Sequence, residues 1–393
     1  MTRTVLVTDG EQRAALAVVR SLGRAGHTVH VCSARGTTLA GASRHCRSET
    51  RVPDPLASPG EYAAAVRSLL ATLGADTLIP IAEPALLALL GARDTLGDVL
   101  LPFPDLETFR RISDKALVLE QAGKLGIAVP RQTSLDDAAD PAAATLTFPV
   151  ALKPARSVGE QDGRRVKVGV RYAADAASLR RVLAQLEPAS FPLLAQHRVG
   201  GPGIGVFLLR WNGEILAAFA HRRIREKPPS GGVSVYREST TLDPALLDSS
   251  RRLLEAFDWS GVAMIEYKVD SATGTPYLME INGRFWGSLQ LAIDAGVDFP
   301  TLLLDAALGV PHPPVLTWKL GVRSRWWWGD VDQLLTRLRH SAARLDLAPG
   351  EPGRLGALAR FLLLWRPGDR NEILRLDDPR PFLRETAAWF RRG

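Results

Sequence analysis

Residues 261–288 read GVAMIEYKVDSATGTPYLMEINGRFWGS, and this stretch contains two strand-like runs on either side of a turn-rich segment. The runs 262–269 and 276–281 flank DSATGT, which is the pattern of a β-hairpin with a longer loop. If the hairpin folds symmetrically about that loop, Glu266 lies across from or diagonal to Glu280. Side chains alternate between the two faces of a strand, so we expect both carboxylates on one face.

The acids of this hairpin predict a positively charged partner. Two carboxylates that face each other on a sheet repel, so the arrangement favours a cation between them. Glu266, Glu280 and the amide of Asn282, which shares a face with Glu280, offer the hard oxygen ligands that Mg²⁺ accepts. The alternative is a solvated strand face whose acids pair with lysines. Arg284 follows directly and is a bidentate donor suited to a phosphate or an oxyanion, which favours the metal site.

Length and composition restrict the class of protein. The chain has 393 residues, 46% hydrophobic and 23% charged, which is typical of a globular protein with two or three domains. Cys32 and Cys46 have no metal-binding spacing and are interpreted as reduced thiols in a cytoplasm. The first residues do not have the pattern of a signal peptide, and no apolar run is long enough for a spanning helix. We therefore expect a cytoplasmic protein without a membrane partner.

The positive charge is concentrated near the end of the sequence. The formal net charge is +7, and residues 336–393 hold 12 Arg against 7 acidic residues, a net +5. No aromatic-interleaved patch or nucleic-acid-binding motif accompanies this segment. We interpret it as a solvated helical cap, in which tryptophans 326–328 contribute packing, and expect no nucleic-acid partner.

The N-terminal region has the pattern of a parallel sheet. Residues 2–34 alternate strand, helix and strand, which is the βαβ opening of such a sheet. A dinucleotide-binding domain is poorly supported, because GxGxxG is absent. Thr8, Asp9 and Glu83 follow strands, so they either face a ligand crevice or act as caps and turn residues.

Two lysines in the middle of the chain are candidates for binding an anion. Lys115 lies in the first turn of a helix predicted for 113–130, where a cation opposes the helix dipole and needs an anionic partner or solvent. Lys153 lies near the end of a strand predicted for 148–155. The loop that follows, 156–165, contains two glycines and could close over phosphates, but it lacks the GK[ST] ending of a P-loop.

The segment 192–211 is predicted to be a strand, a tight glycine turn and a second strand. Backbone groups from Gln196 through His197 to Val199 are well placed to read an adenine edge. An ordinary hairpin is the alternative that this segment leaves open.

A cationic loop is predicted between 220 and 235, where a strand ends and two prolines and two glycines follow. Arg222 and Lys227 lie in this segment, and such a loop can hold an anion with arginines and backbone N–H groups. Together with Thr8, Asp9 and Glu83 it is the expected pocket for a small anionic or polar substrate.

These elements occur in a recognisable order. Lys115, Lys153, Gln196, Glu266 and the MEINGR run at 279–284 follow one another as they do in the ATP-grasp superfamily. Over roughly residues 1–310 the chain resembles carbamoyl-phosphate-synthase-like ATP-dependent carboxylate-amine ligases, in a bacterial branch of predicted carboligases. The resemblance implies an α/β and α+β protein, with an ATP-grasp fold after a Rossmann-like parallel-sheet domain and a helical C-terminal extension. The implied domains are 1–105, 106–195 for the first ATP-grasp lobe, 196–315 for the second lobe, and 316–393.

The resemblance also implies that two lobes clamp ATP and two Mg²⁺ ions, for which Mn²⁺ can substitute. The implied site residues are Lys115, Lys153, Gln196, His197 and Val199 for the nucleotide, Glu266, Glu280 and Asn282 for the metal, and Arg284, Arg222 and Lys227 for catalysis. His197 stands where many members have glutamate, and no acid lies between Arg198 and Arg210 to contact the ribose.

The activity implied by the resemblance is ligation. Typical members phosphorylate a carboxylate to an acyl phosphate, which an amine or a thiol attacks with release of ADP and phosphate. The expected partners are a small-molecule carboxylate and an amine, with a homodimer as the common assembly of relatives. A small-molecule kinase and a non-catalytic nucleotide-binding module are the alternatives.

Overall fold

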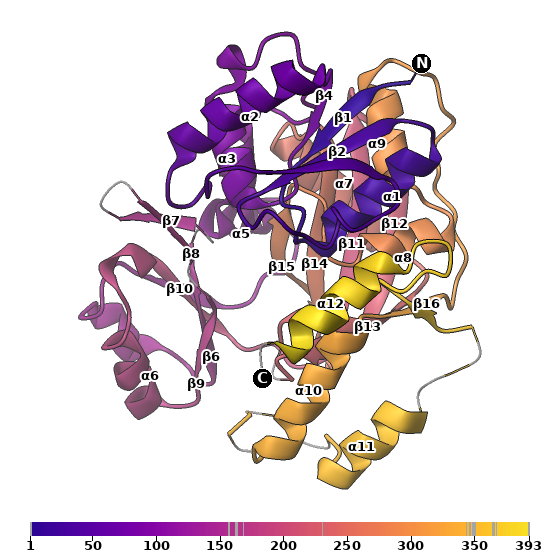
Figure 1. Cartoon of the computed structure of the whole chain (residues 1–393). Coiled ribbons are helices and arrows are strands. Elements are labelled where there is room, and N and C mark those ends of the chain that lie inside the picture. The colour runs from indigo at the N-terminus through magenta and orange to yellow at the C-terminus, as the bar shows by residue number, and fades with distance from the viewer. Residues whose placement is uncertain are drawn as a thin grey trace.

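The structure is a computed structural model, and it describes residues 2–155, 158–161, 164–167, 169–229, 231–342, 344–345, 347, 351–363, 366 and 368–391. Its strands form a parallel sheet near the N-terminus, a small antiparallel sheet, a two-stranded ribbon and a large seven-stranded sheet (Figure 1). Among the residues described, no helix is both long enough and apolar enough to cross a membrane.

The N-terminal sheet is parallel throughout, in the strand order β3-β2-β1-β4. Its apolar strands are completely buried, and α1 covers one face with the periodic residues Leu16, Val19 and Leu22. The βαβ pattern predicted for residues 2–34 is therefore present. The elements are β1 (Thr4–Val7), α1 (Arg13–Arg24), β2 (Thr28–Ser33), β3 (Cys46–Arg51), α2 (Pro59–Leu73), β4 (Thr77–Ile79), α3 (Glu83–Gly91) and the 3₁₀ turn η1 (Arg93–Thr95).

The small sheet is antiparallel, in the order β5-β10-β6-β9, and it carries Lys153 at the end of β6. Leu152 and Leu193 pack beneath α6 with other apolar residues to form a separate core. In the loop predicted for 156–165, the structure has the ribbon β7–β8, and residues 156–157 and 162–163 lie outside the described residues. The elements are β5 (Gln132–Leu135), η2 (Pro141–Thr145), β6 (Val150–Pro154), β7 (Val158–Gln161), β8 (Arg164–Lys167), β9 (Arg171–Ala173), α6 (Ala176–Leu183), η3 (Pro188–Ser190) and β10 (Leu193–His197).

The large sheet has helices on both faces, because alternate residues of its central strands are apolar on both sides. Phe207 and Leu209 of β11 belong to the core that contains α8 and α9, whereas Val206 and Leu208 belong to the core that contains α5 and α7. The sheet order is β15-β14-β11-β12-β13-β16-β17. The elements here are α4 (Leu106–Ser113), α5 (Lys115–Lys124), β11 (Gly203–Trp211), β12 (Glu214–Lys227), β13 (Val233–Ser239), α7 (Pro244–Ala256), β14 (Gly261–Val269), β15 (Pro276–Asn282), α8 (Leu289–Ala295) and α9 (Phe299–Ala307).

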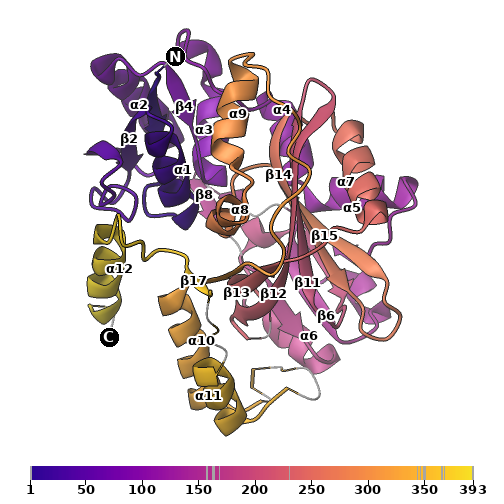
Figure 2. The same cartoon turned by 90° about the vertical axis from the view of Figure 1, so that its right-hand side faces the viewer.

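The C-terminal segment does more than cap the molecule with helices. Two of its strands, β16 and β17, extend the large sheet beyond β13. The chain then returns to the N-terminal sheet, where α12 lies beside it (Figure 2) and Arg384 donates to the carbonyl of Thr38. Buried Asp378 accepts a hydrogen bond from Arg20 of α1 at 2.8 Å. The elements are β16 (Arg323–Arg325), α10 (Trp327–Arg339), α11 (Arg354–Leu363), β17 (Arg370–Asn371) and α12 (Arg380–Phe390).

Candidate active site

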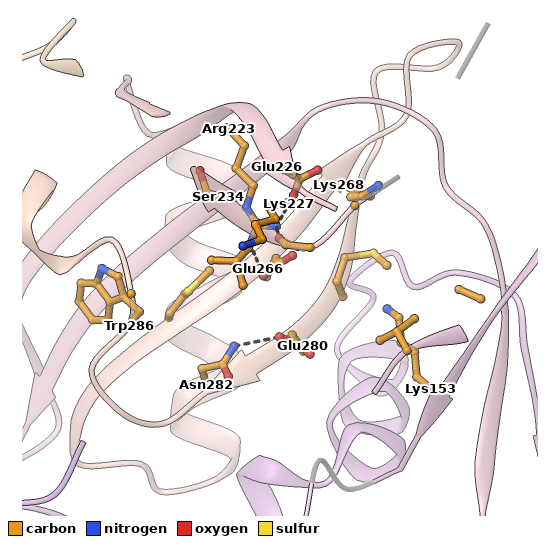
Figure 3. Close-up of a pocket in the computed structure, with 18 of the residues that line it drawn as sticks. Lys153, Arg223, Glu226, Lys227, Ser234, Glu266, Lys268, Glu280, Asn282 and Trp286 are labelled. Carbon is orange, nitrogen blue, oxygen red and sulfur yellow. Dashed lines mark hydrogen bonds and ion pairs between the residues drawn. The ribbon is translucent and has the colours of Figure 1, made fainter. Parts of the chain in front are cut away.

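A cavity of about 500 Å³ lies between the small sheet and the large sheet. Lys153 of β6 enters it from the small sheet, while Glu266 of β14 and Glu280 of β15 enter from the large sheet (Figure 3). Trp286, in the loop after β15, lies at the end of the view opposite Lys153. Of the residues predicted for the site, those that line the cavity are Lys153, Gln196, His197, Val199, Lys227, Glu266, Glu280, Asn282 and Arg284.

The predicted hairpin is present, with the predicted register. Glu266 on β14 pairs directly with Glu280 on β15, and the turn between the strands is closed by Asp270, whose carboxylate accepts from the backbone N–H of Ala272 at 2.8 Å. Asn282 donates to Glu280 Oε1 at 3.0 Å. The two carboxylates and the amide therefore share one wall of the cavity.

Arg284 is held beside the same group. Its guanidinium donates to Asn282 Oδ1 at 3.0 Å and to the carbonyl of Phe285 at 3.1 Å. These contacts orient the arginine toward the oxygen ligands of the hairpin, where it can meet an anion shared with them.

Lysines from outside the large sheet balance Glu280. Asp114 caps α5 and accepts from the backbone N–H of Ala116 at 3.0 Å, which places Lys115 in the first turn. Because α5 packs against β15, Lys115 Nζ lies 3.5 Å from Glu280. Burial raises the pKa of Glu280, but Lys115 and Lys153 outweigh it and hold that pKa at about 2. Glu280 is therefore a carboxylate at neutral pH.

Glu266 is balanced by a different cation. Arg223 of β12 forms ion pairs with both Glu266 and Glu226, and its side chain is only 8% exposed. Burial raises the pKa of Glu266, and Arg223 opposes this effect. The positive charge that the sequence predicts between the two acids is thus supplied by Arg223 and Lys115 in this structure.

The donor set nevertheless fits a hard divalent cation. Glu266, Glu280 and the amide oxygen of Asn282 are the ligand types that Mg²⁺ accepts, and a carboxylate has enough lone pairs to serve Arg223 and a metal together. Among the residues described, no cluster of three or more His, Cys, Asp or Glu suits a metal, so a site here needs the amide.

The segment 192–211 is not a hairpin. β10 belongs to the small sheet and β11 to the large sheet, so residues 198–202 connect the two. Gln196 is buried and donates to Gln132 at 2.9 Å. The backbone N–H groups of His197 and Arg198 are used within the small sheet, donating to carbonyl oxygens at 2.8 and 3.0 Å. An adenine edge bound here would therefore have to contact the other backbone groups of Gln196 to Val199.

Two predicted residues lie outside the main cavity. Arg222 pairs with Glu238, and its side chain is 55% exposed. It is directed away because β12 continues to Lys227 through the region predicted to begin a loop, and consecutive residues of a strand face opposite sides. Lys115 instead lines a small adjoining hollow with Glu83 and Arg284.

The strand-end residues divide in the same way. Asp9 is 7% exposed and accepts from the backbone N–H of Ala82 at 2.9 Å, and Thr8 is completely buried beside it. Thr8 and Asp9 are therefore turn residues, which is one of the two alternatives given by the sequence, and neither is among the described residues that line the cavity. Glu83 lines the hollow beside Lys115.

The sequence analysis gave no site role to five of the described charged residues that line the cavity, namely Arg13, Arg198, Arg223, Glu226 and Lys268. Arg223 follows the strand alternation of RRIREK and could have been found if β12 had been extended to Lys227. Glu226 lies three residues further on and reaches the same cavity because the register of β12 shifts between Arg223 and Glu226, which alternation does not predict. Arg13 begins α1 and has no local signal, because it reaches the cavity only through the packing of the N-terminal sheet against the loop after β15.

Comparisons with known proteins agree with this arrangement. Residues 190–328 match a family described as ATP-grasp in the biosynthetic pathway with Ter operon. No curated protein matches the sequence.

Solved structures show the similarity over more of the chain. The L-amino acid ligase from Bacillus licheniformis is 18% identical with a TM-score of 0.62, over 78% of this chain and 74% of that one. The biotin carboxylase domain dimer of Hydrogenobacter thermophilus 2-oxoglutarate carboxylase, in complex with MgADP, ADP and bicarbonate, is 15% identical with a TM-score of 0.65, over 82% and 74%. N5-carboxyaminoimidazole synthetase from Staphylococcus aureus, complexed with ADP, is 15% identical with a TM-score of 0.61, over 82% and 80%. These similarities confirm the fold predicted from the sequence.

Proposed function

We propose that this chain, in which residues 190–328 match an ATP-grasp family, is an ATP-dependent ligase that activates a small carboxylate as an acyl phosphate and joins it to an amine or a thiol. The observation that carries the proposal is the distribution of charge across the cavity. Lys115 and Lys153 stand on one side of Glu280, and Arg284 is held beside it through Asn282. This set can neutralise and orient a triphosphate next to a carboxylate-based metal site.

The nucleotide is proposed to lie along the cavity from the connection between the sheets to the hairpin. Gln196 to Val199 would hold the adenine, and Lys115 and Lys153 would bind phosphate oxygens. Burial lowers the pKa of Lys153, with Glu280 opposing that effect, so an anion at this position would be bound by a poorly hydrated ammonium group.

Glu266, Glu280 and Asn282 are proposed to hold two Mg²⁺ ions, for which Mn²⁺ can substitute. When bound, the metal would neutralise charge on the phosphoryl oxygens. Arg223 pairs with Glu266 and would orient its carboxylate for the metal. Arg284 would stabilise the negative charge that develops during phosphoryl transfer and on the tetrahedral adduct, because its contacts with Asn282 and Phe285 hold it in place.

The reaction needs little covalent chemistry from the protein. Phosphoryl transfer depends on positioning and charge neutralisation, which the residues named above supply. The ATP γ-phosphoryl group passes to a substrate carboxylate oxygen with ADP as the leaving group. The amine or thiol then attacks the acyl carbon, and phosphate leaves.

The test is product analysis with Mg²⁺-ATP, a panel of amino acids and other carboxylic acids, and hydroxylamine as a general amine trap. ADP together with a hydroxamate supports the proposal and identifies the carboxylate. A stable phosphorylated product without a hydroxamate would indicate a kinase, and AMP with pyrophosphate would overturn the mechanism. Tight ATP binding without turnover on any member of the panel would favour a non-catalytic nucleotide-binding module.

The proposal includes an assembly and a cellular location. The biotin carboxylase domain with the similar fold is a dimer, and we expect a homodimer here, which light scattering of the purified protein would test. A cytoplasmic location is the environment expected for an ATP-consuming enzyme with unpaired cysteines, since Cys32 and Cys46 are both free thiols.

A further inference from the structure

One end of the cavity is built by segments that are far apart in the sequence. Arg13 of α1 lines the cavity with Gly287. Gly287 is the residue after Trp286, which lies on the far side of the view from Lys153 (Figure 3). A Cβ atom at position 287 would lie only 2.8 Å from Arg13 Nη2. The guanidinium is therefore packed against a part of the cavity wall that has no side chain.

The C-terminal segment holds Arg13 in this position. The guanidinium carbon lies 4.0 Å from the centroid of the Trp326 ring, and Nη1 donates to Glu372, whose side chain is 2% exposed. Trp326 is itself fixed by a hydrogen bond from its indole N–H to Glu385 at 2.7 Å. A stacked and paired arginine keeps its planar donors in one orientation.

The charges around Arg13 do not balance. Glu372 also pairs with the completely buried Arg237 at 2.6 Å, so two guanidinium groups share one carboxylate. The next acid, Asp294, is paired with Arg370 at 3.4 Å and with Arg375 at 2.6 Å. Within the part of the chain that the structure describes, this cluster has four arginines and two acids. Arg370 is 46% exposed, but the side chains of Arg13 and Arg237 are only 11% and 0% exposed. Positive charge that is withdrawn from water in this way is costly unless an anion approaches it.

The acids inside the cavity are already used elsewhere. The carboxylates that line it are Glu226, Glu266 and Glu280. Arg223 holds the first two and Lys115 holds the third. Among the residues described, the cavity wall carries seven Lys and Arg side chains against these three acids, and two of the seven, Arg13 and Lys227, also pair with acids outside it, Glu372 and Asp332. ATP with two Mg²⁺ ions has no net charge, so its binding would leave the excess in place.

We infer that the end of the cavity at Arg13 and Gly287 is a subsite for an oxyanion group, a carboxylate or a phosphate, carried by the substrate in addition to the carboxylate that is activated or the amine that attacks. This inference rests on the proposed function and assigns its substrate class, an acid with a second anionic group. Arg13 acts as a specificity-determining residue, with one edge of its guanidinium on Glu372 and Nη2 directed at the subsite. Gly287 leaves the subsite open because it has no side chain.

The experiment is a binding titration with Mg²⁺ and a non-hydrolysable ATP analogue present. The probes are succinate, glutarate and adipate, each compared with its own monoamide and with the phosphonate of the same length. All of them carry a carboxylate at one end, so within each set of equal length only the charge and shape of the other end differ. We expect at least one diacid or phosphonate to bind on the order of tenfold more tightly than the matched monoamide, since an ionised group gains a charge-assisted hydrogen bond. The stronger of the two anions identifies the group that the natural substrate carries.

The variants test whether the preference for a second anion depends on Arg13 or on the positive charge of the protein in general. Arg13→Gln should reduce the ratio of the affinity for the acid to the affinity for the monoamide to about one. Arg13→Lys should retain part of this preference, and Gly287→Ala should lower it by displacing Nη2. Arg24→Gln is the matched control, because Arg24 lies on the same helix and pairs with Asp377 at the surface, so its ratio should equal that of the wild type. A thermal melt of each variant checks folding.

Three results would overturn the inference: equal affinity for acids and monoamides at every chain length, no binding of any probe, or a ratio that persists in Arg13→Gln. The ligase proposal is judged separately by hydroxamate formation. If the protein selects diacids but forms no ADP, the subsite inference stands and the ligase proposal is wrong. If it forms hydroxamates but does not prefer a second anion, the ligase proposal stands and the subsite inference is wrong.

Discussion

Glu266 and Glu280 lie directly opposite each other on β14 and β15, so two carboxylates face the cavity from neighbouring strands. Their repulsion is tolerated because Arg223 pairs with the first and Lys115 with the second. Stability alone does not require such a pair of acids, since like charges opposite each other weaken a sheet. The arrangement is explained if a metal ion uses both.

Replacing Glu280 with Gln tests this explanation. The amide keeps an oxygen for the hydrogen bond from Asn282 but loses the charge, so ADP formation should fall by at least about a hundredfold. The fold should remain, because the substitution removes a repulsion. Glu120→Gln, at an acid with a 58% exposed side chain, serves as the control. Full activity of Glu280→Gln in a coupled ADP assay would refute the site assignment.

Helix α5 offers a matched pair of lysines. Lys115 lies in its first turn, 3.5 Å from Glu280, whereas Lys124 lies in its last turn and pairs with exposed Glu120. Lys115→Gln should raise the dissociation constant for ATP by about tenfold or more, because a charge-assisted contact is lost. Lys124→Gln should leave it unchanged. Calorimetric titration with a non-hydrolysable ATP analogue measures both, and equal affinities would show that Lys115 does not bind the nucleotide.

The connection between the two sheets depends on Gly201. Its φ is +116°, and a Cβ atom there would lie 2.0 Å from the carbonyl oxygen of Val269. Gly201→Ala should therefore cost roughly 3 kcal/mol or more, since the backbone of one strand must move. Gly213 also has a positive φ, +86°, but has no neighbour within 4 Å, so Gly213→Ala should cost about 1 kcal/mol. Denaturant titration of both variants would show the difference, and equal losses would mean that the connection can adapt.

Asp9 predicts a dependence of stability on pH. Burial raises its pKa from 3.8 to about 6, although hydrogen bonds from Thr8 and from the backbone of Ala82 oppose the rise. A carboxyl group whose pKa is higher in the folded state binds protons more strongly there, so its contribution is present below about pH 4 and is lost as pH rises to about 6. The loss amounts to at most about 3 kcal/mol.

Asp9→Asn should remove this loss without disturbing the turn, because Asp9 has a φ of +55° and asparagine accepts that conformation. The free energy of unfolding of the variant relative to the wild type should therefore increase between pH 4 and pH 7. Urea titration at the two pH values gives the difference, and a difference independent of pH would show that Asp9 titrates normally.

Two neighbouring acids test the C-terminal segment. Asp378 is buried and accepts hydrogen bonds from Arg20, from Ser43 at 2.7 Å and from the backbone N–H of Arg44 at 2.9 Å. Asp377 pairs with Arg24 at the surface, with a side chain that is 51% exposed. Asp378→Ala should cost about 3 kcal/mol or more because Arg20 is left buried without its partner. Asp377→Ala should cost at most about 1 kcal/mol, and thermal unfolding of both variants would decide whether this contact supports the fold.

Local patterns predicted the hairpin and the start of α5 correctly. Period-two alternation and a loop of turn residues define the register that pairs Glu266 with Glu280. The helix predicted for 113–130 begins at Lys115, after Asp114 as its cap, and ends earlier than predicted, at Lys124. Both features depend on residues close in sequence. The domain boundaries and the roles of the site residues stay predictions.

Features that depend on distant pairing could not be predicted in the same way. The segment around Gln196 has the pattern of a hairpin, and only the choice of partner strands shows that it joins two sheets. Because β12 continues as a strand past Arg222, consecutive residues face opposite sides of the sheet, and Arg223 reaches the cavity in place of Arg222. Arg13 is about 270 residues from the wall that it contacts, and nothing around it in the sequence indicates that contact.

The pairing of Arg20 with Asp378 has a consequence for the order of events during synthesis. The two residues are 358 positions apart, so α1 and its sheet leave the ribosome long before the counter-charge of Arg20 exists. Burial of an arginine without that partner is unfavourable, and contacts of such separation form slowly. The buried position of Arg20 is therefore complete only when residue 378 is present.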